Sequence, residues 1–532
     1  MILGADWARG RRAWLLAGLF YLPMAAVVLA HLLLPPDGLW PTGFLQYDQG
    51  GYMAMAREAF DETSARAVFG LPTSADPETP QVYANPHLLA LGLVQLVTKA
   101  DPGRLYLLFG ALCGLVFLRL AIALYGRAVP ERDGAALLGL GLFLWGGGLF
   151  VLAGLGRSLV EGHLDYNTPF RFDPYGGFWF LDLGRNLFYA VEAYYHALVF
   201  GLLLALLDRR WLLSLLLMAL LAASHPFTGA QFLAVALAWT LPQYLVAPHD
   251  RPPPWFALGA LAILALFLAY HFWYLPQSAE HRQLMQQWSL AWTLPVSALL
   301  LAHALVLPAA VVTLLRRLLD PRLAALLAVT AGLSLLLANH ELFMTPKQPL
   351  HFTRGYTWFP LFLLSTPWLV PLLRRLLQRR RRLAVAAIAG LFLLDNAAWL
   401  TVQAVQNAGG FGAARYLTAN EREILRVLDS PGSSPLLLVS EDDRLSYDAL
   451  VYTNWRSWYS HEHLTPYAAE RRAEIARWAA AGEEPRAWRE DFAAVAFVTA
   501  WRDDHRSLPW ITADSAIHRI GDRLLVIRWR RP

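Results

Sequence analysis

The stretch AWLLAGLFYLPMAAVVLAHLLL, residues 13–34, runs for about 22 residues without an Asp, Glu, Lys or Arg side chain. A helix of about 20 apolar residues is long enough to cross the hydrocarbon core of a bilayer. The run is not followed by a small-residue cleavage site and soluble sequence, as a secretory signal peptide would be. We therefore interpret it as a membrane anchor and ask how many similar runs follow.

The rest of the 532-residue chain repeats this pattern. With 56% hydrophobic and 13% aromatic residues, it is too apolar for soluble domains of ordinary composition. Eleven runs are predicted to span the membrane: 13–34, 105–125, 134–155, 186–207, 211–224, 228–247, 255–274, 292–315, 323–339, 357–373 and 383–402. The run 86–97 is only about 12 residues long, which favours an interfacial or re-entrant segment. The predicted fold class is a polytopic α-helical membrane protein with about eleven transmembrane helices.

Along the chain, the loops that connect these runs are alternately basic and not basic. The basic loops contain Arg9, Arg11 and Arg12; Arg127 and Arg132; Arg209 and Arg210; Arg251; Arg316, Arg317 and Arg322; and Arg374, Arg375 and Arg379 to Arg382. Short loops rich in Lys and Arg stay in the cytoplasm, so all of these loops and the N-terminus are predicted inside. The loops 35–104, 156–185, 275–291 and 340–356 are then extracytoplasmic. We expect a multi-pass protein of the cytoplasmic membrane.

After about residue 403 the composition becomes that of a soluble domain. The segments PLLLVSEDD (435–443) and FAAVAFVTA (492–500) are typical of buried strands, and 467–482 of a helix that ends at Gly482. The segment 516–529 predicts a hairpin that turns at Gly521-Asp522. The sequence thus divides into a transmembrane module, residues 1–402 with first external loop 35–104, and a small extracytoplasmic α/β domain, residues 403–532.

The first external loop opens with FLQYDQGGYMAMAREAF, residues 44–60. From Tyr52 onward its apolar residues recur at helical spacing, which predicts a short amphipathic helix with Asp48 at its N-terminus. Asp is a preferred helix-capping residue, so Asp48 is interpreted as a cap, as a functional carboxylate or as both. The neighbouring glycines, Gly50 and Gly51, make a poor first turn for a helix and permit close approach to the backbone.

This order of features resembles the GT-C glycosyltransferases. The acid followed by an aromatic in YDQGGY (47–52), the amphipathic helix and the Pro-led run NPHLLALGLVQLVTKA (85–100) are similar to the first external loop of that superfamily, which includes protein O-mannosyltransferases, aminoarabinose transferases and oligosaccharyltransferases. The resemblance implies an inverting transferase that uses a lipid-linked sugar, with Asp48 as the catalytic residue. A further functional acid is common in the second external loop, where GHLDYNTPFRFDPYGG (162–177) offers Asp165 and Asp173.

A sugar donor attached to polyprenyl phosphate requires a base for the acceptor and cations for the leaving phosphate. Tyr47 and Tyr52 flank Asp48 and are candidate substrate contacts. The loop NHELFMTPKQPLHFTRGY (339–356) contributes three donors suited to phosphate, which are Lys347, His351 and Arg354. The alternative interpretation of this loop is an ordinary solvated connection whose cations meet lipid headgroups.

Three further candidates lie near the ends of predicted spans. Glu192 and His196 have i, i+4 spacing and share one helix face, where they contact substrate, bind a metal or simply pair with each other. His225 marks a turn before Pro226 and is a candidate ligand or an ordinary loop histidine. The sequence identifies no cofactor; a divalent metal is neither required nor ruled out.

The expected partners are a polyprenyl-phosphate-sugar donor, membrane lipid and an acceptor that is a glycan, a lipid or a protein. The formal charge of +5 comes from the cytoplasmic arginines, so no nucleic-acid partner is expected. Two other functions compete with glycosyl transfer: a lipid or polysaccharide transporter or flippase, and a non-catalytic surface-polymer assembly protein. A transporter typically shows repeated halves and ionisable groups at the bilayer centre. We find no internal repeat in the sequence.

Overall fold

The computed structural model describes residues 10–60, 68–165, 168–177, 181–246, 251–287, 291–410, 412–429, 435–505 and 508–530. The chain divides into two compact units. The first, here the helical unit, comprises Met1–Leu29, Leu108–Phe267 and Leu290–Val405; the second, here the mixed unit, comprises Ala30–Leu107, Leu268–Ser289 and Gln406–Pro532. Each unit is considered by itself.

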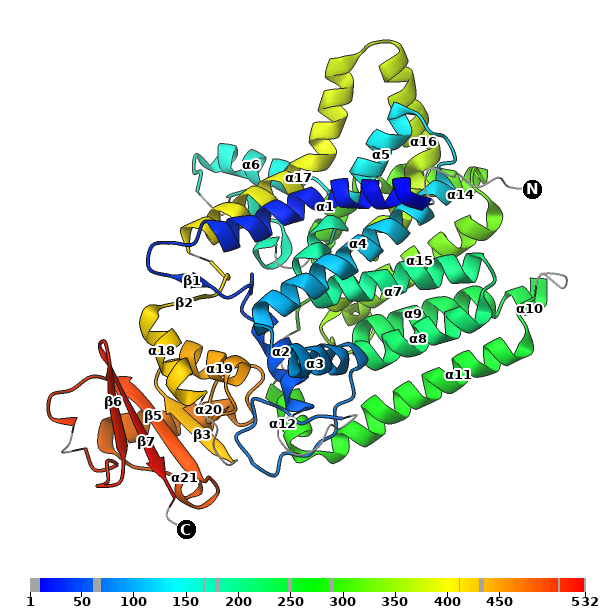
Figure 1. The fold of residues 1–532 in the computed structure, drawn as a ribbon. Helices are drawn as coiled ribbons and strands as arrows, with labels where there is room; N and C mark the ends of the chain where they lie inside the picture. The colour runs from blue at the N-terminus through cyan, green and yellow to red at the C-terminus, as the bar shows by residue number, and fades with distance from the viewer. Residues whose placement is uncertain are drawn as a thin grey trace. The chain divides into compact units, whose positions relative to one another are not determined.

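The helical unit is built from α-helices joined by short 3₁₀ turns (Figure 1). Its elements are α1 (Gly10–Leu33, up to Leu29), α4 (Pro102–Ala128, from Leu108), α5 (Gly134–Trp145), α6 (Phe150–Glu161), η2 (Thr168–Phe170), η3 (Pro174–Gly177), η4 (Gly184–Phe188), α7 (Ala190–Leu207), α8 (Trp211–Ser224), α9 (Pro226–Thr240), α10 (Gln243–Val246), α11 (Pro254–Leu268), α13 (Val296–His303), α14 (Leu307–Arg316), α15 (Pro321–Ala338), η7 (His340–Leu342), η8 (Pro349–Phe352), α16 (Trp358–Gln378) and α17 (Arg382–Gly409, up to Val405). Helices α7, α8, α9 and α15 lie side by side.

Six helices in the described residues are long and apolar enough to cross a membrane, or up to eight if each of two bent pairs forms one span. Every one of the eleven predicted runs contains a helix. Two of those helices, α8 and α9, have only 14 and 15 residues, and α16 contains Pro367 and Pro371. The chain is thus a multi-pass helical protein, and the number eleven stays a prediction. The run at 86–97 forms a helix of 13 residues, Pro86–Thr98.

The predicted span 134–155 is broken between α5 and α6, which meet at 67°. Three glycines, 146–148, occupy the break, and a Cβ on Gly148 would lie 2.3 Å from the carbonyl oxygen of Leu301. A broken helix leaves backbone groups without partners at both new ends. Here α17 supplies them: Asn396 donates to the carbonyls of Trp145 and Gly146, and Asp395 accepts from the amides of Phe150 and Val151.

The predicted span 292–315 is also broken, between α13 and α14, at an angle of 71°. Pro308 lies in the first turn of α14, where a proline costs the helix no hydrogen bond. The two breaks contact each other, because the amide of Leu149 donates to the carbonyl of Leu301 at 3.0 Å. The apolar composition and length of 134–155 and 292–315 predicted helices there, but they did not predict that both helices would be broken.

The mixed unit combines the first long loop, a short middle segment and the C-terminal region. Its elements are β1 (Trp40–Pro41), α2 (Gln49–Glu58), α3 (Pro86–Thr98), the π-helix η5 (Ala269–Tyr274), η6 (Leu275–Gln277), α12 (Ala279–Gln287), β2 (Tyr416–Leu417), α18 (Ala419–Leu428), β3 (Leu436–Ser440), α19 (Asp443–Tyr452), β4 (Arg456–Ser457), α20 (Ala468–Ala481), α21 (Arg486–Glu490), β5 (Ala494–Ala500), β6 (Ala516–Ile520) and β7 (Arg523–Trp529). Strands β3 to β7 form one sheet in the order β4-β3-β5-β7-β6.

This sheet confirms the predicted α/β character of the C-terminal region. Strand β3 pairs in parallel with β4 and β5, while β7 is antiparallel to β5 and β6. The predicted hairpin turns at Gly521, whose φ of 59° suits glycine. The predicted helix 467–482 is α20, and Gly482 ends it in the left-handed conformation.

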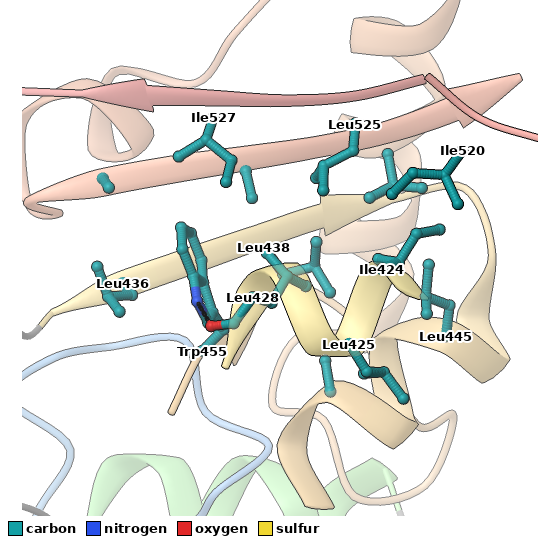
Figure 2. Packing of buried hydrophobic residues seen from close by; sticks show 14 of the residues in the cluster. Ile424, Leu425, Leu428, Leu436, Leu438, Leu445, Trp455, Ile520, Leu525 and Ile527 are labelled. Atoms are coloured by element: carbon teal, nitrogen blue, oxygen red, sulfur yellow. Dashed lines mark hydrogen bonds between the residues drawn. The ribbon is translucent and has the colours of Figure 1, made fainter. Parts of the chain in front are cut away.

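Both faces of the sheet are buried, because alternate residues of each strand point into different cores. Leu436 and Leu438 belong to one core, and Leu437 and Val439 to the other. Figure 2 shows the first core, where Ile424, Leu425 and Leu428 of α18 pack against Leu436, Leu438, Leu525 and Ile527. The Nε1 of Trp455 donates to the carbonyl of Leu428 at 2.7 Å. A strand buried on both faces reads as a continuous apolar run, which is why LLLV was recognisable.

The start of the first loop is tied into this unit. Strand β1 pairs with β2 in antiparallel fashion, and α2 packs against α3 and α19. A Cβ on Gly50 would lie 3.2 Å from the Tyr447 ring, and one on Gly51 would lie 2.7 Å from the Tyr447 hydroxyl. The glycines that weaken the first turn of α2 therefore allow Tyr447 of α19 to approach the helix backbone.

Candidate active site

Asp48 stands at the N-terminus of α2 but does not cap it. Its side chain makes no hydrogen bond to the amides of the first turn, all of which are described. Its Oδ1 instead lies 3.1 Å from Nε2 of His461, and its Oδ2 accepts from the Gln46 amide at 3.3 Å. The Asp48 side chain is 49% exposed, whereas His461 is 5% exposed. The Asp48 side chain is thus not a helix cap in this structure.

The two flanking tyrosines differ in their surroundings. The ring of Tyr47 stacks on Tyr447 and on His461, with centroids 4.6 and 4.8 Å away. Its hydroxyl donates to the carbonyl of Ser460 at 3.0 Å. Burial, followed by nearby acidic groups, raises the pKa of Tyr47, so the hydroxyl stays neutral and acts as a donor. Tyr52 stacks on Tyr106 at 6.2 Å.

A second group of predicted residues comes together in the helical unit. The Arg354 guanidinium forms an ion pair with Glu192. The Arg354 side chain is 12% exposed and the Glu192 side chain is 5% exposed. Arg354 also donates from Nη2 to Nδ1 of His351 at 2.6 Å. Burial holds the pKa of His351 well below its ordinary value of 6.5, which keeps Nδ1 an acceptor. Glu192 lies in the first turn of α7, where a negative charge is favoured.

The strained backbone conformation of Arg354 brings its carbonyl next to His196. Arg354 has a φ of 32°, a left-handed value that is costly for a residue with a side chain. In this conformation its carbonyl lies 2.8 Å from Nε2 of His196, whose Nδ1 lies 2.7 Å from the Glu192 carbonyl. The expected direct pairing of Glu192 with His196 therefore runs through the backbone, and the partner of the Glu192 side chain is Arg354.

Two other predicted residues occupy different positions. His225 accepts from the amide of Thr228 through Nδ1 and so caps α9, and its ring lies 5.9 Å from that of His351. Lys347 is exposed, and its amide donates to Nε2 of His340 at 2.7 Å. The structure therefore groups Glu192, His196, His225, His351 and Arg354, while Lys347 presents its charge at the surface.

The two acids of the second predicted external loop also differ. Asp165 is 47% exposed and accepts from the Thr168 hydroxyl in a local turn. Asp173 is buried and accepts from Arg185 at 2.6 Å. Arg185 also faces Asp182 at 3.3 Å and donates to Asn396 and to the carbonyl of Asp395. Asp173 is thus part of a buried network that includes the α17 residues that satisfy the α5–α6 break.

Sequence reasoning missed His461, Arg185 and Asp182. His461 lies 413 positions from Asp48, and the motif HEH (461–463) was too short to indicate a metal site. Among the described residues, no three or more His, Cys, Asp and Glu side chains are grouped so as to hold a metal ion.

No protein-family model and no curated protein sequence matches this chain. Similar folds occur among solved structures. The oligosaccharyltransferase of Archaeoglobus fulgidus, tethered to an acceptor peptide with an NVT sequon, is 11% identical; the similarity covers 93% of this chain and 70% of that one, with a TM-score of 0.47. Its apo form is 12% identical, with coverages of 92% and 70% and a TM-score of 0.41.

ArnT from Cupriavidus metallidurans, in the apo state, is 13% identical over 96% of this chain and 98% of that one, with a TM-score of 0.48. Oligosaccharyltransferases and aminoarabinose transferases are among the proteins that the first external loop resembles. Identities this low describe a likeness of fold, and TM-scores below 0.5 describe a partial one. The functional proposal consequently rests on the side chains of this chain.

Proposed function

We propose that this protein is a membrane glycosyltransferase that moves a sugar from a polyprenyl-phosphate carrier to an acceptor at the outer face of the cytoplasmic membrane. Asp48 is the general base. The acceptor hydroxyl or amide loses its proton to Asp48 as its oxygen or nitrogen bonds to the anomeric carbon. The bond from that carbon to the phosphate oxygen breaks, and the phosphate leaves with the electron pair. Attack opposite the leaving group inverts the anomeric centre.

One observation carries this proposal: a carboxylate at a helix N-terminus that is not used as a cap and is half exposed. A general base must reach a substrate proton directly, so its exposed oxygen has to be available. Oδ1 of Asp48 faces His461, and Oδ2 has the longer contact, 3.3 Å, to Gln46. This arrangement suits a base that is held on one side and open on the other.

The leaving phosphate requires positive charge. Arg354 is paired with buried Glu192, so the pair carries no net charge and its role is to order the loop 339–356. Lys347 of the same loop is exposed and so is accessible to a phosphate group. Of the two cations proposed for the phosphate, we therefore favour Lys347, with Arg354 fixing the loop from which it extends.

A lipid or polysaccharide transporter is the second candidate, because broken helices such as α5–α6 and α13–α14 are typical of transporters. In transporters, however, the free ends of broken helices bind the substrate or the ion. Here the side chains of Asp395 and Asn396 already form hydrogen bonds with the backbone groups at the α5–α6 break. That occupancy favours a structural role for the break and leaves glycosyl transfer as the better-supported function.

The test is mass analysis of surface glycans and glycoproteins in cells with and without the gene. We expect one glycan signal to disappear on deletion and to return when the wild-type gene is supplied. In the same cells, a polyprenyl-phosphate-linked sugar should accumulate, because its consumer is missing. Unchanged glycans together with an unchanged carrier pool would contradict the proposal. A glycan precursor trapped on the cytoplasmic side would instead indicate a flippase.

A further inference from the structure

We infer that His461 is a positioning residue for Asp48, fixing one carboxylate oxygen so that the other faces the acceptor. The inference rests on the proposed function of Asp48. His461 Nε2 lies 3.1 Å from Asp48 Oδ1, and the histidine is almost fully buried while the aspartate is half exposed. A buried ring that meets an exposed carboxylate can orient it without blocking its open side.

The hydrogen bonds of His461 select one form of its ring. The backbone amide of His463 donates to Nδ1 of His461 at 3.1 Å, so Nδ1 must carry a lone pair. In the neutral ring the proton then sits on Nε2, which donates to Oδ1 of Asp48. A ring protonated on both nitrogens would set the Nδ1 proton against the His463 amide. The geometry therefore favours a neutral donor that leaves the negative charge on Asp48.

The orientation of the ring is itself fixed by the first loop. The His461 ring stacks on that of Tyr47 at 4.8 Å, and the Tyr47 hydroxyl donates to the carbonyl of Ser460, the preceding residue. The amide of His461 donates to the hydroxyl of Thr465 at 3.0 Å. Because Tyr47 directly precedes Asp48, the residue that holds the ring and the residue that receives its proton belong to one short segment.

The 460–465 turn has a second anchor in the first loop. The hydroxyl of Thr73 donates to the carbonyl of Leu464 at 2.6 Å. The turn is thus held at both ends by residues far from it in sequence, and small shifts of His461 are opposed from both sides. Such rigid support is what a positioning residue needs, because misplacing a catalytic group by about 1 Å can cost about 100-fold in rate.

Two substitutions separate the roles of the ring. His461→Phe keeps a ring to stack on Tyr47 but loses the donor, whereas His461→Gln loses the ring but keeps an N–H near the position of Nε2. At equal protein levels, we expect His461→Phe to restore surface glycan to the deletion strain about 10-fold to 100-fold more slowly than wild type, the range for a hydrogen bond to a charged group. His461→Gln should recover most of the rate.

A residue that only stabilised the fold would give the opposite order, with Phe better than Gln, and that order would overturn the inference. Asp48→Asn separates the two proposals. Loss of activity in Asp48→Asn with wild-type activity in His461→Phe would remove the role of His461 and keep that of Asp48.

The form of the ring can be measured without any substrate. Nitrogen NMR of the full-length protein labelled with ¹⁵N-histidine, assigned by difference against His461→Gln, reports which ring nitrogen carries the proton. We expect a protonated Nε2 and an unprotonated Nδ1. A ring protonated on Nδ1 alone could not donate to Asp48 and would overturn the inference, whatever the activity of the variants.

Discussion

Asp48 and Asp173 are both acids of predicted external loops, yet their surroundings differ in every respect that matters for chemistry. Asp48 is half exposed, and its Oδ1 lies 3.1 Å from Nε2 of His461. Asp173 is buried and accepts from Arg185, which reaches onward to Asp395 and Asn396 of α17. A buried acid paired with an arginine is committed to the fold, whereas an exposed and oriented acid remains available to a substrate. Burial, more than position in the sequence, separates their roles.

The largest expected effect lies on the buried side of this comparison. Arg185→Met keeps most of the side-chain volume but leaves Asp173 and Asp182 without their cation. Breaking one partner of a buried ion pair costs about 3–5 kcal/mol, and we expect a loss of this size in the free energy of unfolding. The measurement is thermal and denaturant unfolding of the purified protein in detergent.

Arg127→Met is the matched control, because Arg127 pairs with Asp208 at 2.5 Å but both side chains are about one-third exposed. An exposed pair contributes about 0–1 kcal/mol, so this variant should unfold almost like wild type. Equal losses for the two variants would mean that burial does not distinguish the two ion pairs.

The next comparison is between the two cations of the loop 339–356. Arg354→Met should lower stability by about 3 kcal/mol, since it leaves buried Glu192 without its partner. Lys347→Met should change stability by less than about 0.5 kcal/mol, as exposed substitutions usually do. Its effect should instead be on donor use, seen as a raised KM for the carrier-linked sugar with the acceptor KM unchanged. Unchanged donor dependence in Lys347→Met would move the phosphate cation elsewhere.

A separate expected effect is a pH dependence of stability that comes from Asp182. Burial raises the pKa of Asp182 from 3.8 to about 7, and the nearby acids Asp173 and Asp395 contribute in the same direction. Arg185, 3.3 Å away, acts in the opposite direction and lowers the pKa. Between pH 3.8 and about pH 7, the Asp182 carboxyl binds a proton more tightly in the folded state than in the unfolded state. Stability is therefore highest below about pH 4 for this group and falls as pH rises toward 7.

The slope should approach about 1.4 kcal/mol per pH unit where one proton is lost on unfolding. Asp182→Asn cannot titrate, so its unfolding midpoint should depend less on pH across this range, with a part retained by Asp173, whose pKa is also raised by burial. Asp165→Asn, in an exposed acid of the same loop, is the control and should keep the wild-type slope. An unchanged slope in Asp182→Asn would assign the pH dependence to another group.

The elements that the sequence predicted well have a local cause. Hairpin β6–β7, helix α20 and strand β3 each follow from the pattern of a short segment, because a turn glycine, a capping glycine or an unbroken apolar run lies within it. The long apolar runs were found for the same reason. Their interruptions at 146–148 and near Pro308 were missed, because whether a glycine run breaks a helix depends on the partners that α17 provides.

The site was predicted only as far as its local residues. Asp48 and Tyr47 stood out because a carboxylate beside two glycines is unusual at a helix start. The pairing of Arg354 with Glu192 was missed, because the two residues are 162 positions apart in the chain. The contact of Asp48 with His461 was missed for the same reason. Contacts between distant segments leave no trace in the spacing of a single sequence, so the neighbours of Asp48 had to come from the structure.

Asp48→Asn tests most directly whether Asp48 is a general base. Asp48 makes no side-chain cap and is half exposed, and Asn keeps the oxygen that accepts from His461, so stability should change little. Loss of a general base costs about 100-fold to 10,000-fold in rate, so supplying Asp48→Asn to the deletion strain should leave the surface glycan absent at wild-type protein levels. Asp165→Asn should restore it. Near-normal glycan with Asp48→Asn would contradict the account.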